Sequence, residues 1–254
     1  MKKLFLMLLL VPFMFIMIGC DEDPTEAISP PSSLQLVGAT DGAGLVLTWS
    51  PSSTTDIDGY RIYFNGTEVW EGTATTYTHP NASLGEYQIV AYRGSEESDP
   101  LTRNTQTSIQ TGTGMIYAFY VSDQPSGYGW NLSAGTGSSY SFTTGNASYI
   151  DFYYDNDNDL TSADVYSTDF PNETGFVMSS TTYNDLGVVP ATGAASYTNY
   201  VTPGLNQTYA VIIKKGRSYG NYAKLQVTGI DTAQNSISFR WTLQTIDKWR
   251  VVGD

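Results

Sequence analysis

The chain has 254 residues, of which 25 are acidic and 12 are basic, and it carries a formal net charge of −13 at pH 7. Because Lys2 and Lys3 are the only charged residues among residues 1–20, the rest of the chain holds 10 basic against 25 acidic residues, a net charge of −15. Such a surface repels phosphate groups, which excludes nucleic-acid binding through a basic face and disfavours direct docking on anionic lipid.

The N-terminal residues predict an export signal followed by a lipid anchor. Lys2 and Lys3 precede an apolar run over residues 4–18, which is shorter than the roughly 20 residues that a membrane-spanning helix needs. The run ends at Met17-Ile18-Gly19-Cys20, which resembles the lipobox of bacterial lipoproteins. The resemblance implies cleavage before Cys20 and acylation of its thiol, with palmitate as one of the acyl groups. We therefore expect a signal peptide over residues 1–20 and membrane attachment through Cys20.

Residues 21–28 are polar and begin with Asp21-Glu22-Asp23, which predicts a solvated tether. The acidic triplet also resembles the export signal that directs some Gram-negative lipoproteins to the outer face of the outer membrane. We therefore expect an outer-membrane lipoprotein that is exposed at the cell surface.

The sequence after the tether has the pattern of an all-β protein. Apolar and polar residues alternate, and Gly, Asn and Asp recur at short intervals. This alternation is typical of strands with one buried face, and the recurring residues are those that form the turns between strands. We expect one β domain over residues 29–104, a linker over the polar, low-complexity residues 105–113, and a second β domain over residues 114–254.

The first unit predicts a β-sandwich. Residues 45–49 and 59–64 alternate as strands, and Asn65-Gly66 suits a type I′ hairpin because both positions need a positive φ. Over about 75 residues the unit resembles a fibronectin type III domain, through Pro30-Pro31, Trp49, Tyr60, Tyr63, Leu84 and Tyr87. The last two are similar to the family's tyrosine corner, in which the phenol bonds to nearby backbone. The resemblance implies a seven-stranded sandwich and little about activity.

The second unit predicts a β-sandwich or a flattened barrel. Its candidate strands are residues 115–121, 140–142, 149–154, 164–166, 175–178, 209–214, 222–230 and 236–245. The order of the segments at 141–145, 162–166, 209–214, 219–227 and 237–244 resembles that of HmuY-like lipoproteins, most densely over residues 209–244. That family has an all-β fold and includes haemophores, so the resemblance implies haem as a ligand.

Haem binding would need an axial ligand other than a histidine pair. The best-known member of the HmuY-like family holds iron between two histidines, whereas this chain has one, His79, in the first unit. Methionine is the other ligand that haem chemistry offers. After the signal peptide only Met115 and Met178 remain, and both also suit packing within a strand. Met178 lies in mid-domain near loops, and we take it as the candidate haem ligand.

The run Asp155-Asn156-Asp157-Asn158-Asp159 is a candidate calcium site. Hard oxygen ligands at alternate positions suit Ca²⁺, which makes Asp155, Asp157 and Asp159 the candidate ligands. The EF-hand pattern then ends, because Leu160 stands where glycine is needed and Tyr166 where the bidentate acid belongs. A solvated turn between strands explains the same residues, so both interpretations stay open.

Aromatic residues are abundant, with 19 Tyr and 5 Trp. Exposed aromatic side chains beside small polar residues are typical of sites for sugar rings or protein partners, although tyrosine is also common in strands. We expect the loops Gly127-Tyr128-Gly129-Trp130 and Gly216-Arg217-Ser218-Tyr219 to present Tyr128, Trp130 and Tyr219 to a ligand.

Catalytic motifs are missing from the sequence. The second unit has no His and no Cys, which excludes Ser-His and Cys-His nucleophilic machinery there. Asp151, Asp164 and Glu173 are the acids that a glycoside hydrolase would use, but acids near strand ends are usually just solvated. We expect a non-enzymatic binding module. Haem capture, carbohydrate binding or adhesion, and a structural role with an envelope protein are the alternatives.

Overall fold

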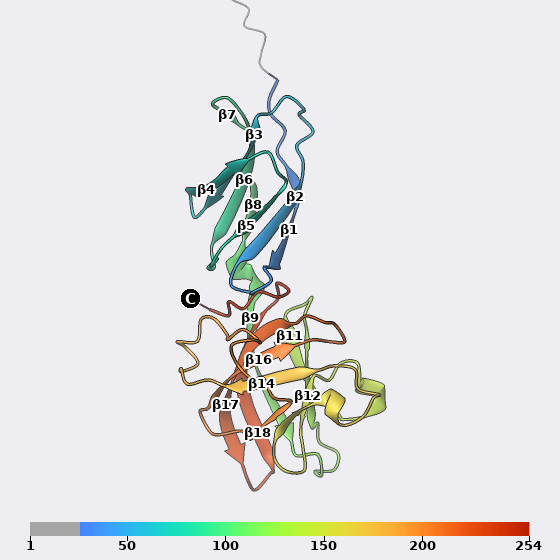
Figure 1. Cartoon of the computed structure of the whole chain (residues 1–254). Coiled ribbons are helices and arrows are strands. Elements are labelled where there is room, and N and C mark those ends of the chain that lie inside the picture. Colours follow the sequence, from blue (N-terminus) through green and yellow to red (C-terminus); the bar gives the residue numbers. More distant parts are fainter. Residues whose placement is uncertain (1–25, 254) are drawn as a thin grey trace, which may run out of the picture.

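Two β-sandwich domains lie end to end in the computed structural model, which describes residues 26–253 (Figure 1). Cys20, the expected signal peptide and the first part of the tether lie outside the described residues. Strands dominate the described chain, which confirms the predicted all-β class. Among residues 26–253, no helix is long and apolar enough to cross a membrane.

The first domain has the fold of a fibronectin type III sandwich. One sheet has the order β1 (Ser32–Gly38), β2 (Leu45–Ser50), β5 (Thr76–His79). The facing sheet has the order β4 (Thr67–Gly72), β3 (Gly59–Phe64), β6 (Glu86–Arg93), β7 (Glu96–Glu97), and β8 (Leu101–Asn104) also pairs with β6. Pro100 stands between β7 and β8, and because proline has no backbone N–H to donate, it interrupts the last strand of the sheet.

Local sequence explains this sandwich. Leu45, Leu47 and Trp49 on β2 are all buried, while the residues between them are more exposed, as alternation predicts. Asn65 and Gly66 both have positive φ, at 49° and 78°, in the turn between β3 and β4. The predicted tyrosine corner differs from expectation, as described next.

Tyr87 is fully buried, and its hydroxyl lies 2.7 Å from Nδ1 of His79 instead of bonding to nearby backbone. Burial lowers the pKa of His79 below its ordinary value. The neutral imidazole of His79 therefore satisfies the buried hydroxyl of Tyr87 by a hydrogen bond, so His79 has a structural partner within the first domain.

The second domain is a sandwich of two antiparallel sheets. Of the two folds that the sequence predicted, it is therefore the sandwich and not the flattened barrel. One sheet has the order β11 (Thr136–Tyr140), β10 (Gly127–Asn131), β12 (Phe152–Tyr154), β13 (Leu160–Ser162), β15 (Tyr200–Val201). The other has the order β14 (Thr174–Met178), β16 (Thr208–Ile213), β17 (Asn221–Asp231), β18 (Ser236–Gln244), β9 (Ile109–Tyr117). Aromatic and aliphatic side chains from both sheets fill the space between them.

Two segments differ from the sequence prediction. Residues 105–113 are not a linker, because a 3₁₀ turn, η1 (Thr105–Ser108), leads directly into β9 and Thr113 pairs with Arg240 of β18. Threonine and glutamine suit a strand at the edge of a sheet with one solvated face, and this is why a polar stretch forms regular structure here. Residues 164–166 were expected as a strand, and they fall in the 3₁₀ turn η3 (Ala163–Val165) and its end. A third such turn is η2 (Thr144–Asn146).

The C-terminal segment after β18 joins the two domains. Ile246, Trp249 and Val251 pack into the core of the first domain, and Trp249 is completely buried there. The backbone N–H of Gly38 donates to the carbonyl of Asp247 at 2.7 Å. A Cβ at Gly38 would lie 2.4 Å from the carbonyl carbon of Lys248, so only glycine permits this close approach.

Arg250 extends the connection. Its Nε donates to the carbonyl of Asp41 in the first domain at 2.8 Å, and its Nη1 donates to the carbonyl of Val189 in the second at 2.5 Å. Apolar burial and hydrogen bonds therefore hold the domains in one arrangement, and residues 246–251 lie at the junction (Figure 1).

Trp249→Ala is expected to lower the free energy of unfolding by about 3–5 kcal/mol, because it empties a fully buried site of indole size. Urea denaturation followed by circular dichroism measures the loss, and the two domains are expected to unfold in separate transitions. Val188→Ala, at a half-exposed neighbour of the same segment, is the control. A single transition with wild-type stability would contradict the structural role of Trp249.

Candidate ligand-binding site

The acidic run forms a turn between β12 and β13. One oxygen of Asp155, Oδ1, accepts hydrogen bonds from the backbone N–H groups of Asp157 and Asp159, each at 2.9 Å, and Oδ2 accepts one from the Thr161 hydroxyl at 2.7 Å. Within residues 26–253, no three His, Cys, Asp or Glu side chains converge as a metal site would require. The turn interpretation describes these residues, and the calcium prediction has no converging set of ligands.

Met178 lies at the end of the edge strand β14 with 65% of its surface exposed. Met115 is on β9, at the opposite edge of the same sheet, and is also exposed. His79 belongs to the first domain, where it contacts Tyr87. The structure therefore does not bring the candidate haem ligand together with Met115 or His79.

Tyr128 and Trp130 are core residues of β10, contrary to the expectation that they present themselves to a ligand. They are 1% and 2% exposed, and the Tyr128 hydroxyl accepts a hydrogen bond from Nε1 of Trp241. The glycines around them serve close packing, because a Cβ at Gly129 would lie 1.7 Å from the carbonyl oxygen of Tyr149. Glycines that looked like loop residues in the sequence are therefore needed inside the sheet.

Asp151 carries a buried charge beside this core. Its Oδ1 lies 2.7 Å from Nζ of Lys215, and its Oδ2 accepts the backbone N–H of Trp130 at 2.7 Å. Burial raises the pKa of Asp151 to about 6, and the nearby Lys215 opposes that rise. The ion pair ties the loop between β16 and β17 to the opposite sheet.

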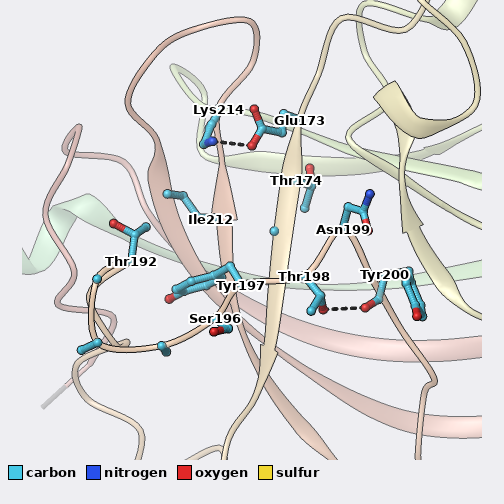
Figure 2. A pocket seen from close by; sticks show the side chains of 14 residues that line it. Glu173, Thr174, Thr192, Ser196, Tyr197, Thr198, Asn199, Tyr200, Ile212 and Lys214 are labelled. Atoms are coloured by element: carbon cyan, nitrogen blue, oxygen red, sulfur yellow. Dashed lines mark hydrogen bonds and ion pairs between the residues drawn. The ribbon is translucent and has the colours of Figure 1, made fainter.

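A cavity of about 700 Å³ opens on the second domain, and we call it the main cavity (Figure 2). Its walls come from β14, from the end of β16 and from the segment at residues 192–200. Residues that line it include Glu173, Thr174, Thr192, Ser196, Tyr197, Thr198, Asn199, Tyr200, Ile212 and Lys214. Hydroxyl, amide and phenol groups thus line the cavity together with the apolar side chains of Ala194, Ala195 and Ile212.

The charged and aromatic side chains of the main cavity differ in whether other groups of the protein hold them in place. Lys214 and Glu173 pair with each other at one side of the opening (Figure 2). The Tyr197 hydroxyl donates to the carbonyl of Pro190 at 2.9 Å, which holds that ring in the wall. Tyr200 is 56% exposed, so its ring is available to a ligand.

A smaller cavity of about 350 Å³ adjoins the main cavity, and we call it the side cavity. The two share Thr192, Ile212 and Lys214 in their walls. The side cavity also contains Tyr219, one of the three predicted contact aromatics, and Lys248. Tyr219 therefore lies at an open cavity, whereas Tyr128 and Trp130 are buried.

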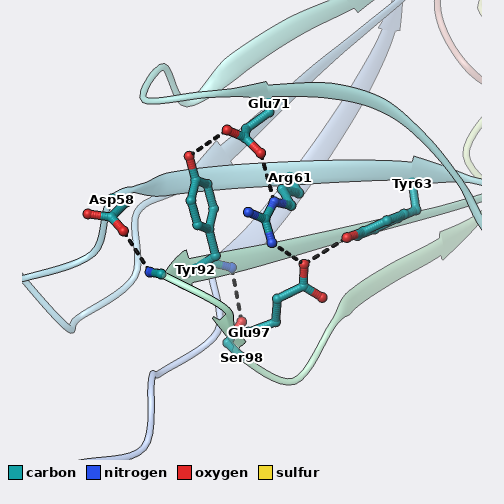
Figure 3. A network of polar contacts seen from close by, with 9 residues as sticks. Asp58, Arg61, Tyr63, Glu71, Tyr92, Glu97 and Ser98 are labelled. Atoms are coloured by element: carbon teal, nitrogen blue, oxygen red, sulfur yellow. Dashed lines mark hydrogen bonds and ion pairs between the residues drawn. The ribbon is translucent and has the colours of Figure 1, made fainter.

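The outer face of the first domain carries a separate polar network (Figure 3). Arg61 pairs with Glu71 at 2.8 Å and with Glu97 at 2.9 Å, and its guanidinium lies 4.0 Å from the ring centre of Tyr92. The Tyr63 hydroxyl donates to Glu97, and burial together with that bond raises the pKa of Tyr63 to about 12. These polar groups are paired with one another, and the network therefore connects the four strands β3, β4, β6 and β7.

No protein-family model and no curated protein matches the sequence. A solved structure described as "Structure of FN3tt mut" is 18% identical, with 30% of this chain and 90% of that chain covered, at a TM-score of 0.26. "Central Fibronectin-III array of RIM-binding protein" is 11% identical, with 78% and 68% covered, at a TM-score of 0.27. Scores this low add no argument, and the fibronectin type III fold of the first domain rests on its sheet order.

Lys215→Met is expected to destabilise the fold by about 3 kcal/mol at pH 8, because it leaves the buried Asp151 carboxylate without its partner. The pKa of Asp151 is about 6 in the folded protein against 3.8 for the ordinary group. The folded state therefore holds the extra proton between these pH values, and the contribution of Asp151 to stability falls as pH rises through them.

At pH 5 Asp151 is mostly protonated, so Lys215→Met should cost much less there than at pH 8. Urea denaturation at the two pH values measures the difference. Lys214→Met removes the neighbouring lysine from a more exposed ion pair and is the matched control, with less than about 1 kcal/mol expected at both pH values. Equal losses for Lys215→Met at pH 5 and pH 8 would show that Asp151 does not titrate as described.

Proposed function

We propose that this protein is a membrane-anchored, non-enzymatic binding module whose second domain holds a glycan in the main cavity. The observation that carries the proposal is the lining of that cavity. Sugars offer many hydroxyl groups and apolar C–H faces, and the cavity offers hydroxyl and amide groups beside exposed Tyr200. The chemistry of the wall and of a sugar are thus complementary.

Binding is favoured over cleavage by the acids at the site. Glycoside hydrolysis generally uses two carboxyl groups that flank the scissile bond. Glu173 is the one carboxylate among the residues that line the main cavity, and it pairs with Lys214. Asp151 is buried against Lys215, and Asp164 accepts a hydrogen bond from Ser162. Asp151 and Asp164 are therefore engaged by other residues, and Glu173 has no second carboxylate beside it in the main cavity.

Surface display fits the arrangement of the two domains. The described chain enters at the end of the first domain that is remote from the second (Figure 1), and the lipobox-like segment precedes that point in the sequence. The buried Trp249 holds the second domain against the first. A fibronectin-like spacer fixed in this way would keep the main cavity away from the membrane to which Cys20 attaches the chain.

Haem capture is less well supported than glycan binding. The residues that line the main and side cavities include no His, Met or Cys, so neither cavity offers the histidine or methionine ligation that the sequence left open. Met178 lines neither of them. The HmuY-like resemblance of the second domain, and the haem binding that it implies, stay predictions. A structural role with an envelope protein is the remaining alternative if no glycan binds.

Tyr200→Ala is expected to weaken glycan binding about tenfold, because it removes the exposed ring of the main cavity. A glycan array identifies the best ligand, and isothermal titration calorimetry compares the variant with the wild type. Tyr120→Ala is the matched control, since Tyr120 is 51% exposed and does not line the cavity. Failure of every glycan to bind, or unchanged affinity in Tyr200→Ala, would overturn the proposed function.

Cys20→Ser is expected to abolish labelling of the full chain by radioactive palmitate in a Gram-negative host. The thiol that the lipobox-like segment would supply for acylation is then missing. Membrane fractionation provides the second measurement, with the wild-type chain expected in the outer-membrane fraction and the variant absent from it. Equal labelling of both chains would refute the lipid anchor while leaving the glycan site untouched.

A further inference from the structure

Positive charge is concentrated where the two domains meet. Half of the 10 Lys and Arg residues that follow Cys20 lie in two short segments. These segments are the loop between β16 and β17 and the C-terminal segment, and they contribute Lys214, Lys215, Arg217, Lys248 and Arg250. For a chain with a net charge of −15 after residue 20, this is an uneven distribution, and it has a structural counterpart.

Most of these cations have an acidic partner. Lys214 pairs with Glu173, Lys215 with Asp151, and Arg217 with Asp247. Arg250 instead donates to backbone carbonyls on both sides of the junction. Among residues 26–253, Lys248 forms no ion pair with a carboxylate, so its charge is available in the cavity that it lines.

The side cavity has the composition of an anion site. Lys214 and Lys248 both line it, and no Asp or Glu is among its lining residues. Hydroxyl donors come from Thr40, Thr192 and Ser218. Thr40 belongs to the first domain and Thr192 to the second, so the cavity is complete only when the domains are docked as observed.

Lys248 is held in place before any ligand binds. Its backbone has a φ of 63°, a conformation in which glycine or asparagine is favoured over lysine. Its N–H donates to the carbonyl of Gly220 at 3.0 Å, and its Nζ lies 4.7 Å from the ring centre of Tyr219. The guanidinium of Arg217 lies at the same distance from that ring. Tyr219 thus orients two cations, which lowers the entropy that an anion must overcome to bind.

We propose that the side cavity binds the carboxylate of an acidic sugar, so that the ligand of this protein is a glycan that contains uronic acid. The inference rests on the proposed function and names its substrate class. One sugar ring would lie in the main cavity against Tyr200, and the carboxylate of a neighbouring ring would reach Lys248 and Lys214 in the side cavity. The shared wall of Thr192, Ile212 and Lys214 makes this path continuous.

The acidity of the whole chain does not oppose this. At physiological ionic strength charges separated by more than about 8 Å are largely screened in solvent, so the nearest groups decide the local potential. The charged groups that line the side cavity are Lys248, which forms no ion pair with a carboxylate among residues 26–253, and Lys214, which pairs with Glu173 on the side of the main cavity. Repulsion from distant acids slows the approach of an acidic glycan, whereas the lysines determine how long it stays.

Calorimetric titration of the purified full chain with matched oligosaccharides tests the proposal. The probes are oligomers of galacturonate, glucuronate and mannuronate, and the methyl ester of each, which keeps the sugar and removes the charge. We expect at least one oligouronide to bind about tenfold more tightly than its ester, since a charge-assisted hydrogen bond is lost on esterification. Raising the salt concentration should reduce this difference.

Lys248→Gln is expected to weaken binding of the oligouronide about tenfold and to leave binding of its ester unchanged. Arg93→Gln makes the same change in net charge and is the control, because Arg93 pairs with Asp56 in the first domain and lines neither cavity. Equal affinity for acid and ester, or an unaffected oligouronide in Lys248→Gln, overturns the proposal. If neutral glycans bind and oligouronides do not, the acidic specificity falls while the glycan site stands. If no glycan binds, both fall.

Discussion

The two domains depend on one packing contact, the insertion of the C-terminal segment into the base of the first sandwich. Trp249 and its neighbours Ile246 and Val251 complete a hydrophobic core that the first domain leaves open at this end. Burial of a large aromatic side chain contributes several kcal/mol, and here that energy is available only when the second domain is docked. Gly38 permits the approach because any larger residue would collide with the Lys248 backbone. The core of the first domain is thus completed by a segment that follows the second domain's last strand.

The same contact determines the composition of the candidate site. Lys248 lies next to Trp249 in the chain, so anchoring the indole fixes the position of the ammonium in the side cavity. Thr40 follows β1 on the first domain and reaches the same cavity because Gly38 is held against Asp247. Packing and recognition are therefore coupled through adjacent residues, and no flexible linker separates the domains.

The sequence predicted the parts of the molecule that local periodicity determines. Alternation identified β2 with Trp49, and Asn65-Gly66 identified the turn between β3 and β4, because each depends on residues close in the chain. Tyr128 and Trp130 were misplaced because a Gly-x-Gly pattern is equally typical of a loop and of close packing between strands. Nothing local marks Trp249, whose partners are about 200 residues earlier, and the residues of the main cavity at 192–200 resemble any solvated Ser/Thr loop. The loop with Tyr219 differs from the one with Tyr128 and Trp130, because Tyr219 lines the side cavity.

Two adjacent lysines show how the fold divides one run of charge between stability and recognition. Lys214 and Lys215 directly follow β16, and Lys215 lies in the turn after it with a positive φ of 45°. Lys215 turns inward to the buried Asp151, and Lys214 turns outward into the wall that the two cavities share. The inward pair compensates the desolvation of Asp151 and ties the loop to the opposite sheet, which limits how far Tyr219 can move. The side cavity is therefore held from two directions, by the Asp151–Lys215 pair on the loop with Tyr219 and by Trp249 on the segment with Lys248. A rigid cationic wall on an acidic protein requires both, because a mobile lysine would lose side-chain entropy each time it met an anion.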